Sequence, residues 1–123
     1  MGKRLILYVD DDREVLETFK IGLEARGYSM LMAESGDEGL ELLKTNTPDL
    51  IIADLRMQPM NGFDFFQKVR KDVKWAKVPF FFLTAVDDFL AQKYGQKLGV
   101  DAYITKPVDM DNLDALISSK LPG

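Results

Sequence analysis

The fold follows from one stretch of the sequence, Pro48-Asp49-Leu50-Ile51-Ile52-Ala53-Asp54-Leu55-Arg56-Met57. Four apolar residues run unbroken from Leu50 to Ala53, and a carboxylate follows them. A run this short, opened by a proline, is typical of a strand that is buried on both faces of a parallel sheet. Such sheets bind their ligands at the carboxyl ends of the strands. Asp54 is therefore the first candidate for a functional residue.

The composition limits the chemistry that the chain can perform. Its 123 residues, 46% of them hydrophobic, predict one soluble domain over 1–123 that either acts alone or belongs to a longer protein. The absence of cysteine and histidine excludes disulfides, thiolate chemistry and the common transition-metal ligands. The net charge of −4 argues against direct nucleic-acid binding, and no apolar run is long enough for a membrane helix. We expect a cytoplasmic protein in which any bound metal is a hard cation held by oxygen.

Apolar runs alternate with segments of helical periodicity along the chain. The runs predict strands at 5–9, 28–33, 50–54, 78–83 and 100–105. Helices are expected from Asp12 to a cap at Gly27, from a capping box at Ser35 to the break at Pro48, after the loop 56–61, over 87–98 and over 109–119. This alternation predicts an α/β fold, with a single doubly wound five-stranded parallel sheet and five helices on its two faces. In the predicted helices, Phe63, Phe66 and Val69 are expected to face inward, and Leu90, Tyr94 and Leu98 recur at intervals of four. Trp75 is expected to pack partly in a loop.

Four predicted strands end in polar side chains that a parallel sheet would bring to one edge. Asp10 and Asp11 end the first strand, Asp54 ends the third, Thr84 the fourth and Lys106 the fifth. Three carboxylates packed together repel one another unless a cation lies among them, and oxygen ligands suit Mg²⁺. A carboxylate, a divalent cation and a lysine are the groups needed to move a phosphoryl group onto an aspartate. Taken singly, Thr84 would be an ordinary strand residue and Lys106 a solvated charge.

Four segments carry a resemblance to one protein family. They are Val9-Asp10-Asp11-Asp12, the loop from Asp54-Leu55 to Met60-Asn61-Gly62, Leu83-Thr84-Ala85, and Tyr103-Ile104-Thr105-Lys106-Pro107. Because these segments occur in this order, nearly the whole chain resembles the receiver domains of two-component response regulators, and chemotaxis receivers in particular. The resemblance implies a flavodoxin-like sheet with the strand order 2-1-3-4-5. It also implies a signalling switch that is no enzyme beyond its own phosphorylation and dephosphorylation.

The resemblance implies how the acidic residues divide their roles. Asp54 would accept a phosphoryl group from a histidine kinase or a phosphotransfer protein. Asp11 and Asp54 would bind Mg²⁺ directly, the Arg56 backbone carbonyl would be a further ligand, and Asp10 would act through water. Apart from the resemblance, the Arg56 side chain leaves the backbone two residues after Asp54, which suggests the hypothesis that it reaches the acidic pocket and partly neutralises it.

The remaining matches concern the phosphoryl group and the signalling surface. By the same resemblance Thr84 and Lys106 would hold phosphoryl oxygens, and Tyr103 would move with Thr84 during switching. This movement would change the surface made by the fourth helix, the fifth strand and the fifth helix. The alternative for Tyr103 is a simple edge-strand aromatic without a role in switching. Leu116 stands where receivers that dimerise through this surface usually have arginine, so we expect a monomer that meets a different downstream protein.

Two positions depart from the family pattern. Asp12 stands where the family usually has glutamate, so it is either peripheral to the site or simply a helix N-cap. Gln58 stands where the family usually has proline, and Pro59 follows it. The loop from Asp54 to Gly62 keeps the usual length, so Mg²⁺ binding is expected to survive.

Two other functions fit parts of the same pattern. A phosphatase with an aspartate nucleophile also forms a phosphoaspartate, but it typically has a second acid two residues later, where this chain has Arg56. A receiver-like domain that only binds a partner, without phosphorylation, would be expected to lack Asp11, Asp54 or Lys106, and this chain has all three.

Overall fold

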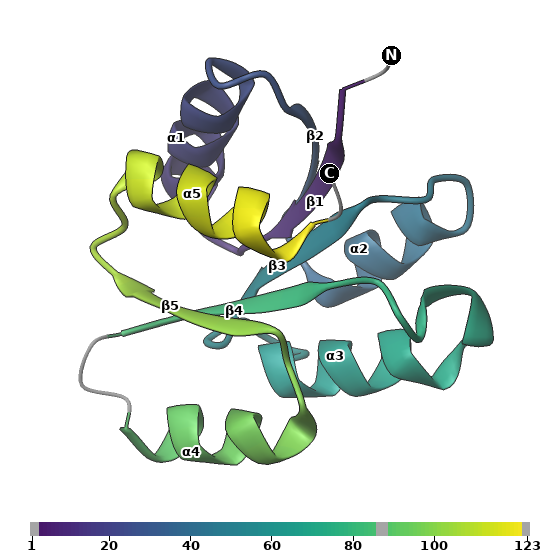
Figure 1. The fold of residues 1–123 in the computed structure, drawn as a ribbon. Helices are drawn as coiled ribbons and strands as arrows, with labels where there is room; N and C mark the ends of the chain where they lie inside the picture. The colour runs from purple at the N-terminus through teal and green to yellow at the C-terminus, as the bar shows by residue number, and fades with distance from the viewer. Residues whose placement is uncertain (1–2, 86–88, 122–123) are drawn as a thin grey trace.

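Strands and helices alternate in the computed structural model, which describes residues 3–85 and 89–121 (Figure 1). The strands are all parallel and form one sheet in the order β2-β1-β3-β4-β5, so the predicted fold class and strand order are confirmed. The strands are β1 Leu5–Val9, β2 Ser29–Ala33, β3 Leu50–Asp54, β4 Phe80–Ala85 and β5 Ala102–Lys106. The helices are α1 Arg13–Glu24, α2 Gly36–Leu43, α3 Gly62–Lys71, α4 Phe89–Leu98 and α5 Met110–Lys120, with a short 3₁₀ helix, η1 Val73–Trp75.

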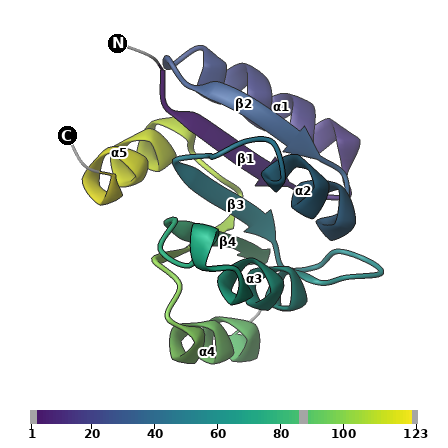
Figure 2. The same ribbon diagram turned by 90° about the vertical axis from the view of Figure 1, so that its right-hand side faces the viewer.

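Helices cover both faces of the sheet (Figures 1 and 2). Successive side chains of a strand point to opposite faces. Along β1, Ile6 and Tyr8 therefore pack in the core beneath α1 and α5, whereas Leu7 and Val9 pack in the core beneath α2 and α3. All four are fully buried. Fully burying an aliphatic side chain stabilises the fold by about 1.5–3 kcal/mol, so both helical layers are held by the central strands.

Side-chain caps start the helices close to where the sequence predicted. Asp12 caps α1 by accepting hydrogen bonds from the backbone N–H groups of Glu14 at 3.0 Å and Val15 at 3.4 Å, so its N-cap role is confirmed. Ser35 caps α2 in the same way. Gly27 has φ of +95°, a conformation that favours glycine, and its N–H donates to the carbonyl of Glu24 at the end of α1.

The side of α4 that faces the sheet matches the sequence expectation only in part. Leu90 and Tyr94 are 78% and 46% exposed. Leu98 does pack against the core, together with Ala91, and Gly95 is buried between them. Small residues face inward because Tyr103 of the edge strand occupies the space beneath this helix. The predicted start of the helix at 87 lies outside the described residues.

Two further expectations about packing need correction. In α3, Phe65 is fully buried, whereas Phe63 is only partly buried and meets the ring of Tyr94 at 4.7 Å between centroids. Trp75 does not pack only partly in a loop, as predicted. Its side chain is 8% exposed and belongs to the core beneath α2 and α3. Strand β2 begins one residue later than predicted, and strands β4 and β5 each begin two residues later.

The parallel strands bring the polar residues of the sequence motifs to one edge. Asp10 follows β1, Asp54 is the last residue of β3, and Lys106 is the last residue of β5. Thr84 lies one residue before the end of β4. Within the described ranges, none of the helices has the length and apolar character needed to cross a membrane.

Candidate metal and phosphoryl site

Three aspartates meet at the carboxyl edge of the sheet. One carboxylate oxygen from each of Asp10, Asp11 and Asp54 lies within 4.8 Å of the others. Asp10 and Asp54 are buried, whereas Asp11 is exposed. All the donors are oxygens, and three negative charges at this separation repel one another, so the cluster suits a small hard divalent cation. The three carboxylates that the sequence predicted to converge do so, and they could hold a metal ion.

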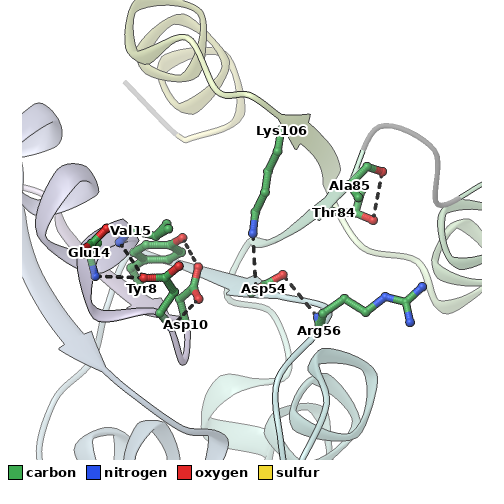
Figure 3. Close-up of polar contacts among 10 residues, drawn as sticks. Tyr8, Asp10, Glu14, Val15, Asp54, Arg56, Thr84, Ala85 and Lys106 are labelled. Carbon is green, nitrogen blue, oxygen red and sulfur yellow. Dashed lines mark hydrogen bonds and ion pairs between the residues drawn. The ribbon is translucent and has the colours of Figure 1, made fainter.

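Asp10 is fixed by hydrogen bonds to both of its carboxylate oxygens. The Tyr8 hydroxyl donates to Oδ2 at 2.6 Å, and the Asp12 backbone N–H donates to Oδ1 at 2.9 Å (Figure 3). Burial raises the pKa of Asp10 above its usual value, and the charge of Asp54 adds to this, while the two hydrogen bonds and Lys106 act in the opposite direction. Burial is the largest of these effects.

Asp54 lies between a lysine and the backbone of the next loop. The Lys106 Nζ is 3.5 Å from Oδ2, and the Arg56 backbone N–H donates to Oδ1 at 3.2 Å. The Lys106 side chain is 39% exposed, so at this length the ion pair adds little to stability. It places a positive charge beside the Asp54 carboxylate, which is what the sequence predicted for these two residues.

The loop after β3 returns to Asp54 because α3 begins with glycine. The Gly62 N–H donates to the Leu55 carbonyl at 3.0 Å. A Cβ at Gly62 would lie 2.6 Å from the Asp54 carbonyl oxygen, closer than real contacts allow. Met60 of the same loop packs against Gly36 at the start of α2. These close approaches hold the loop against the strand end that carries Asp54.

The Arg56 side chain does not extend toward the acidic cluster. In Figure 3 its guanidinium points away from Asp54, and the residue is exposed. The hypothesis that the guanidinium neutralises the pocket is therefore wrong. The Arg56 backbone remains next to Asp54, through the N–H contact described above.

Thr84 and Tyr103 lie on neighbouring strands and make separate contacts. Thr84 is fully buried, and its hydroxyl donates to the Ala85 carbonyl at a long 3.5 Å (Figure 3). The Tyr103 hydroxyl donates to the Ala91 carbonyl of α4 at 3.1 Å, and its ring lies 5.6 Å from that of Phe82. Tyr103 is thus more than an exposed edge-strand aromatic, because its hydroxyl joins β5 to α4.

Tyr8 is the residue of this site that the sequence analysis missed. It was read as part of an apolar strand, and its phenol places a hydroxyl on Asp10. A signal was present, since residues two apart on an extended segment share a face. Tyr8 and Asp10 stand in that relation.

Comparisons with known proteins place the chain in a family with this fold. Residues 6–118 match the family model of the response regulator receiver domain. Protein PilH of Pseudomonas aeruginosa is 32% identical over 118 residues, which cover 96% of this chain and 98% of PilH. The "Probable transcriptional regulator ycf27" of Porphyridium aerugineum is 35% identical over 121 residues, which cover 98% of this chain. The chain spans about half the length of the ycf27 relatives, 49% of this one and 45% of that from Cyanidium caldarium.

Solved structures give the same picture. The chemotaxis response regulator CheY4 of Vibrio cholerae superimposes with a TM-score of 0.88 at 25% identity, covering 96% of this chain and 98% of that one. A response regulator receiver protein from Pseudomonas putida gives a TM-score of 0.89 at 28% identity, with 98% and 99% coverage.

Proposed function

Because the chain belongs to the family of response regulator receiver domains, which are signalling switches of two-component systems, we propose that its signal is a phosphoryl group accepted on Asp54. The observation that carries the proposal is the group formed by Asp54, the two neighbouring aspartates and Lys106 at one sheet edge. The donor is a phosphohistidine of a histidine kinase or a phosphotransfer protein.

The chemistry is an in-line displacement at phosphorus. An oxygen of the Asp54 carboxylate forms a bond to phosphorus while the P–N bond to the donor histidine breaks, and the imidazole keeps the electron pair and gains a proton. Lys106, already 3.5 Å from Asp54, binds one phosphoryl oxygen. The Thr84 hydroxyl leaves its long hydrogen bond to the Ala85 carbonyl and donates to another phosphoryl oxygen. Bound Mg²⁺ neutralises charge on the carboxylates and the phosphoryl oxygens.

The family resemblance assigns the metal ligands, and burial and hydrogen bonding agree with that assignment. Asp11, which is exposed, and Asp54 would bind Mg²⁺ directly, and the Arg56 carbonyl would be a further ligand. Asp10 acts through water: both of its oxygens already accept hydrogen bonds, which supports an indirect role. Mg²⁺ usually keeps several waters and takes few protein carboxylates, in agreement with this set.

The output is a change at the surface formed by α4, β5 and α5. When Thr84 turns to the phosphoryl group, Tyr103 on the next strand adjusts, and its hydroxyl bond to Ala91 connects that adjustment to α4. We expect the partner at this surface to be another protein, not nucleic acid or a membrane, and the domain to stay monomeric in the cytoplasm. The whole protein's output is a separate question, because several relatives are about twice as long.

Mass spectrometry after incubation with acetyl phosphate and Mg²⁺ tests the proposal. The wild-type chain should gain the mass of one phosphoryl group, while Asp54→Asn, which keeps the shape of the side chain but not the nucleophile, should gain none. Equal labelling of the two proteins would overturn the assignment. Sustained turnover of a phosphomonoester would favour a phosphatase instead, although Arg56, two residues after Asp54, cannot serve as its general acid.

A further inference from the structure

A tyrosine and an aspartate form a buried pair beside the proposed metal site. Tyr8 and Asp10 are each 0% exposed. The Tyr8 ring packs on Phe19 of α1 at 4.3 Å between centroids, and this contact fixes the direction of its hydroxyl. The hydroxyl donates to Asp10 Oδ2 at 2.6 Å, a length typical of a strong bond to a carboxylate (Figure 3).

We propose that Tyr8 is a positioning residue for the Mg²⁺ site, acting by holding the Asp10 carboxylate in the orientation that receives a metal-bound water. The inference rests on the proposed function. It adds to that function a residue that touches neither metal nor phosphoryl group and acts through a carboxylate.

The geometry explains why Asp10 needs this support. The Asp12 N–H holds Oδ1, and Tyr8 holds Oδ2. Together the two donors fix the rotation of the carboxylate about its Cβ–Cγ bond. Because Asp10 is fully buried, water cannot replace the phenol easily. Without Tyr8 the Oδ2 atom would lack this donor, and the carboxylate would turn away from the cluster to find another.

The phenol remains a hydrogen-bond donor under all ordinary conditions. Burial, together with the adjacent Asp10 charge, raises the pKa of Tyr8 far above its usual value. The bond therefore runs from Tyr8 to the Asp10 carboxylate, and the pair provides orientation rather than a proton. Groups that fix a ligand in this way typically change metal affinity about tenfold or more when they are removed.

Tyr8→Phe is the variant that tests the inference, with Tyr28→Phe as its matched control. Phenylalanine keeps the ring that packs on Phe19 and removes only the hydroxyl. Tyr28 also donates to an aspartate, Asp114 Oδ1, at 2.6 Å, but that pair joins the end of α1 to α5. Calorimetric Mg²⁺ titration should show about tenfold weaker binding for Tyr8→Phe and unchanged binding for Tyr28→Phe.

A second measurement does not depend on any variant being stable. The Tyr8 hydroxyl proton is buried and strongly bonded, so in proton NMR it should exchange slowly with water and give a downfield resonance. That resonance should shift as Mg²⁺ is added to the wild-type protein. A hydroxyl that merely supports the core would give a resonance insensitive to Mg²⁺.

The results separate this inference from the proposed function. If the wild-type protein binds Mg²⁺ and Tyr8→Phe binds it equally or more tightly, the positioning role is overturned and the metal site stands. If the two tyrosine variants lose affinity to the same degree, Tyr8 has no specific role. If the wild-type protein binds no Mg²⁺, both the metal site and the role of Tyr8 are wrong.

Discussion

The three clustered aspartates differ in solvent exposure: Asp11 is exposed, whereas Asp10 and Asp54 are buried. Burial and hydrogen bonding restrict Asp10, so Asp11 is the carboxylate with the freest access to a hydrated ion. In the function that we propose, Asp10 would act through water, Asp11 would bind the cation directly, and Asp54 would both bind the cation and accept the phosphoryl group.

Asp11→Ala should weaken Mg²⁺ binding by about tenfold or more, because it deletes a direct ligand from a site that has few. Calorimetric titration measures the change. The control is Asp12→Asn, which removes a neighbouring charge but keeps the side-chain oxygen that caps α1. Similar losses in both variants would mean that general negative charge, and not ligation by Asp11, attracts the cation.

Asp10→Asn should make the metal-free protein more stable at neutral pH. Burial raises the pKa of Asp10 in the folded state above its usual value, so the fold favours the neutral carboxyl. This contribution to stability is present below the unfolded value and is lost as pH rises through the folded pKa. Urea unfolding over a pH series should therefore show the advantage of the asparagine variant growing with pH. A difference that does not vary with pH would contradict the shift.

At the scale of elements, α4 packs on the sheet through few large apolar side chains among those that the structure describes. Its inward side carries Ala91 and Leu98 with Gly95 between them. The Tyr103 hydroxyl reaches it from β5, so a single aromatic residue connects helix and edge strand. A helix held in this way can shift at low cost, which suits a surface that must change.

Gly95→Ala tests this connection. A Cβ at Gly95 would overlap the Tyr103 hydroxyl, so the ring must leave its place or α4 must move. We expect a loss of about 1–3 kcal/mol in unfolding free energy, as for overpacking, with faster amide exchange in α4. In a Tyr103→Ala background the same substitution should cost far less, and equal costs in the two backgrounds would disprove the coupling.

The elements were largely predictable from the sequence, for physical reasons that also explain the misses. The unbroken run at Leu50–Ala53 and the caps at Asp12 and Ser35 depend on local chemistry, so strands and helix starts were found. The inward side of α4 depends on Tyr103, far away in the sequence, and periodicity alone selected Leu90 and Tyr94 wrongly. The convergence of the strand-end carboxylates was foreseen because topology fixes it. The direction of the Arg56 side chain depends on its surroundings, so it could not be predicted from the sequence.

At the scale of the whole molecule, the α4–β5–α5 surface has a clear division of charge. Lys93 and Lys97 are exposed on α4. Two of the aspartates nearby also make contacts within the fold: Asp111 pairs with Arg26 at 2.9 Å although its side chain is 86% exposed, and Asp114 accepts a hydrogen bond from Tyr28.

Beryllofluoride, which mimics the phosphoryl group on aspartate, should alter this surface without producing a dimer. Amide exchange should change between Phe89 and Asp114, while light scattering at micromolar protein continues to give the monomer mass. Helix α2, which packs on β1 and β2, provides the internal comparison. An activation-dependent dimer with crosslinks between two copies of α4 would contradict the expectation based on Leu116.

The most direct test of phosphoryl acceptance is to locate the acyl phosphate along the chain. Borohydride reduces an aspartyl phosphate to homoserine, and peptide mapping then identifies the modified position. After treatment with acetyl phosphate and Mg²⁺, homoserine should be found at Asp54 and should be absent when Mg²⁺ is chelated. Homoserine at Asp10, Asp11 or Asp12, or equal labelling at Asp54 without Mg²⁺, would contradict the account of this site.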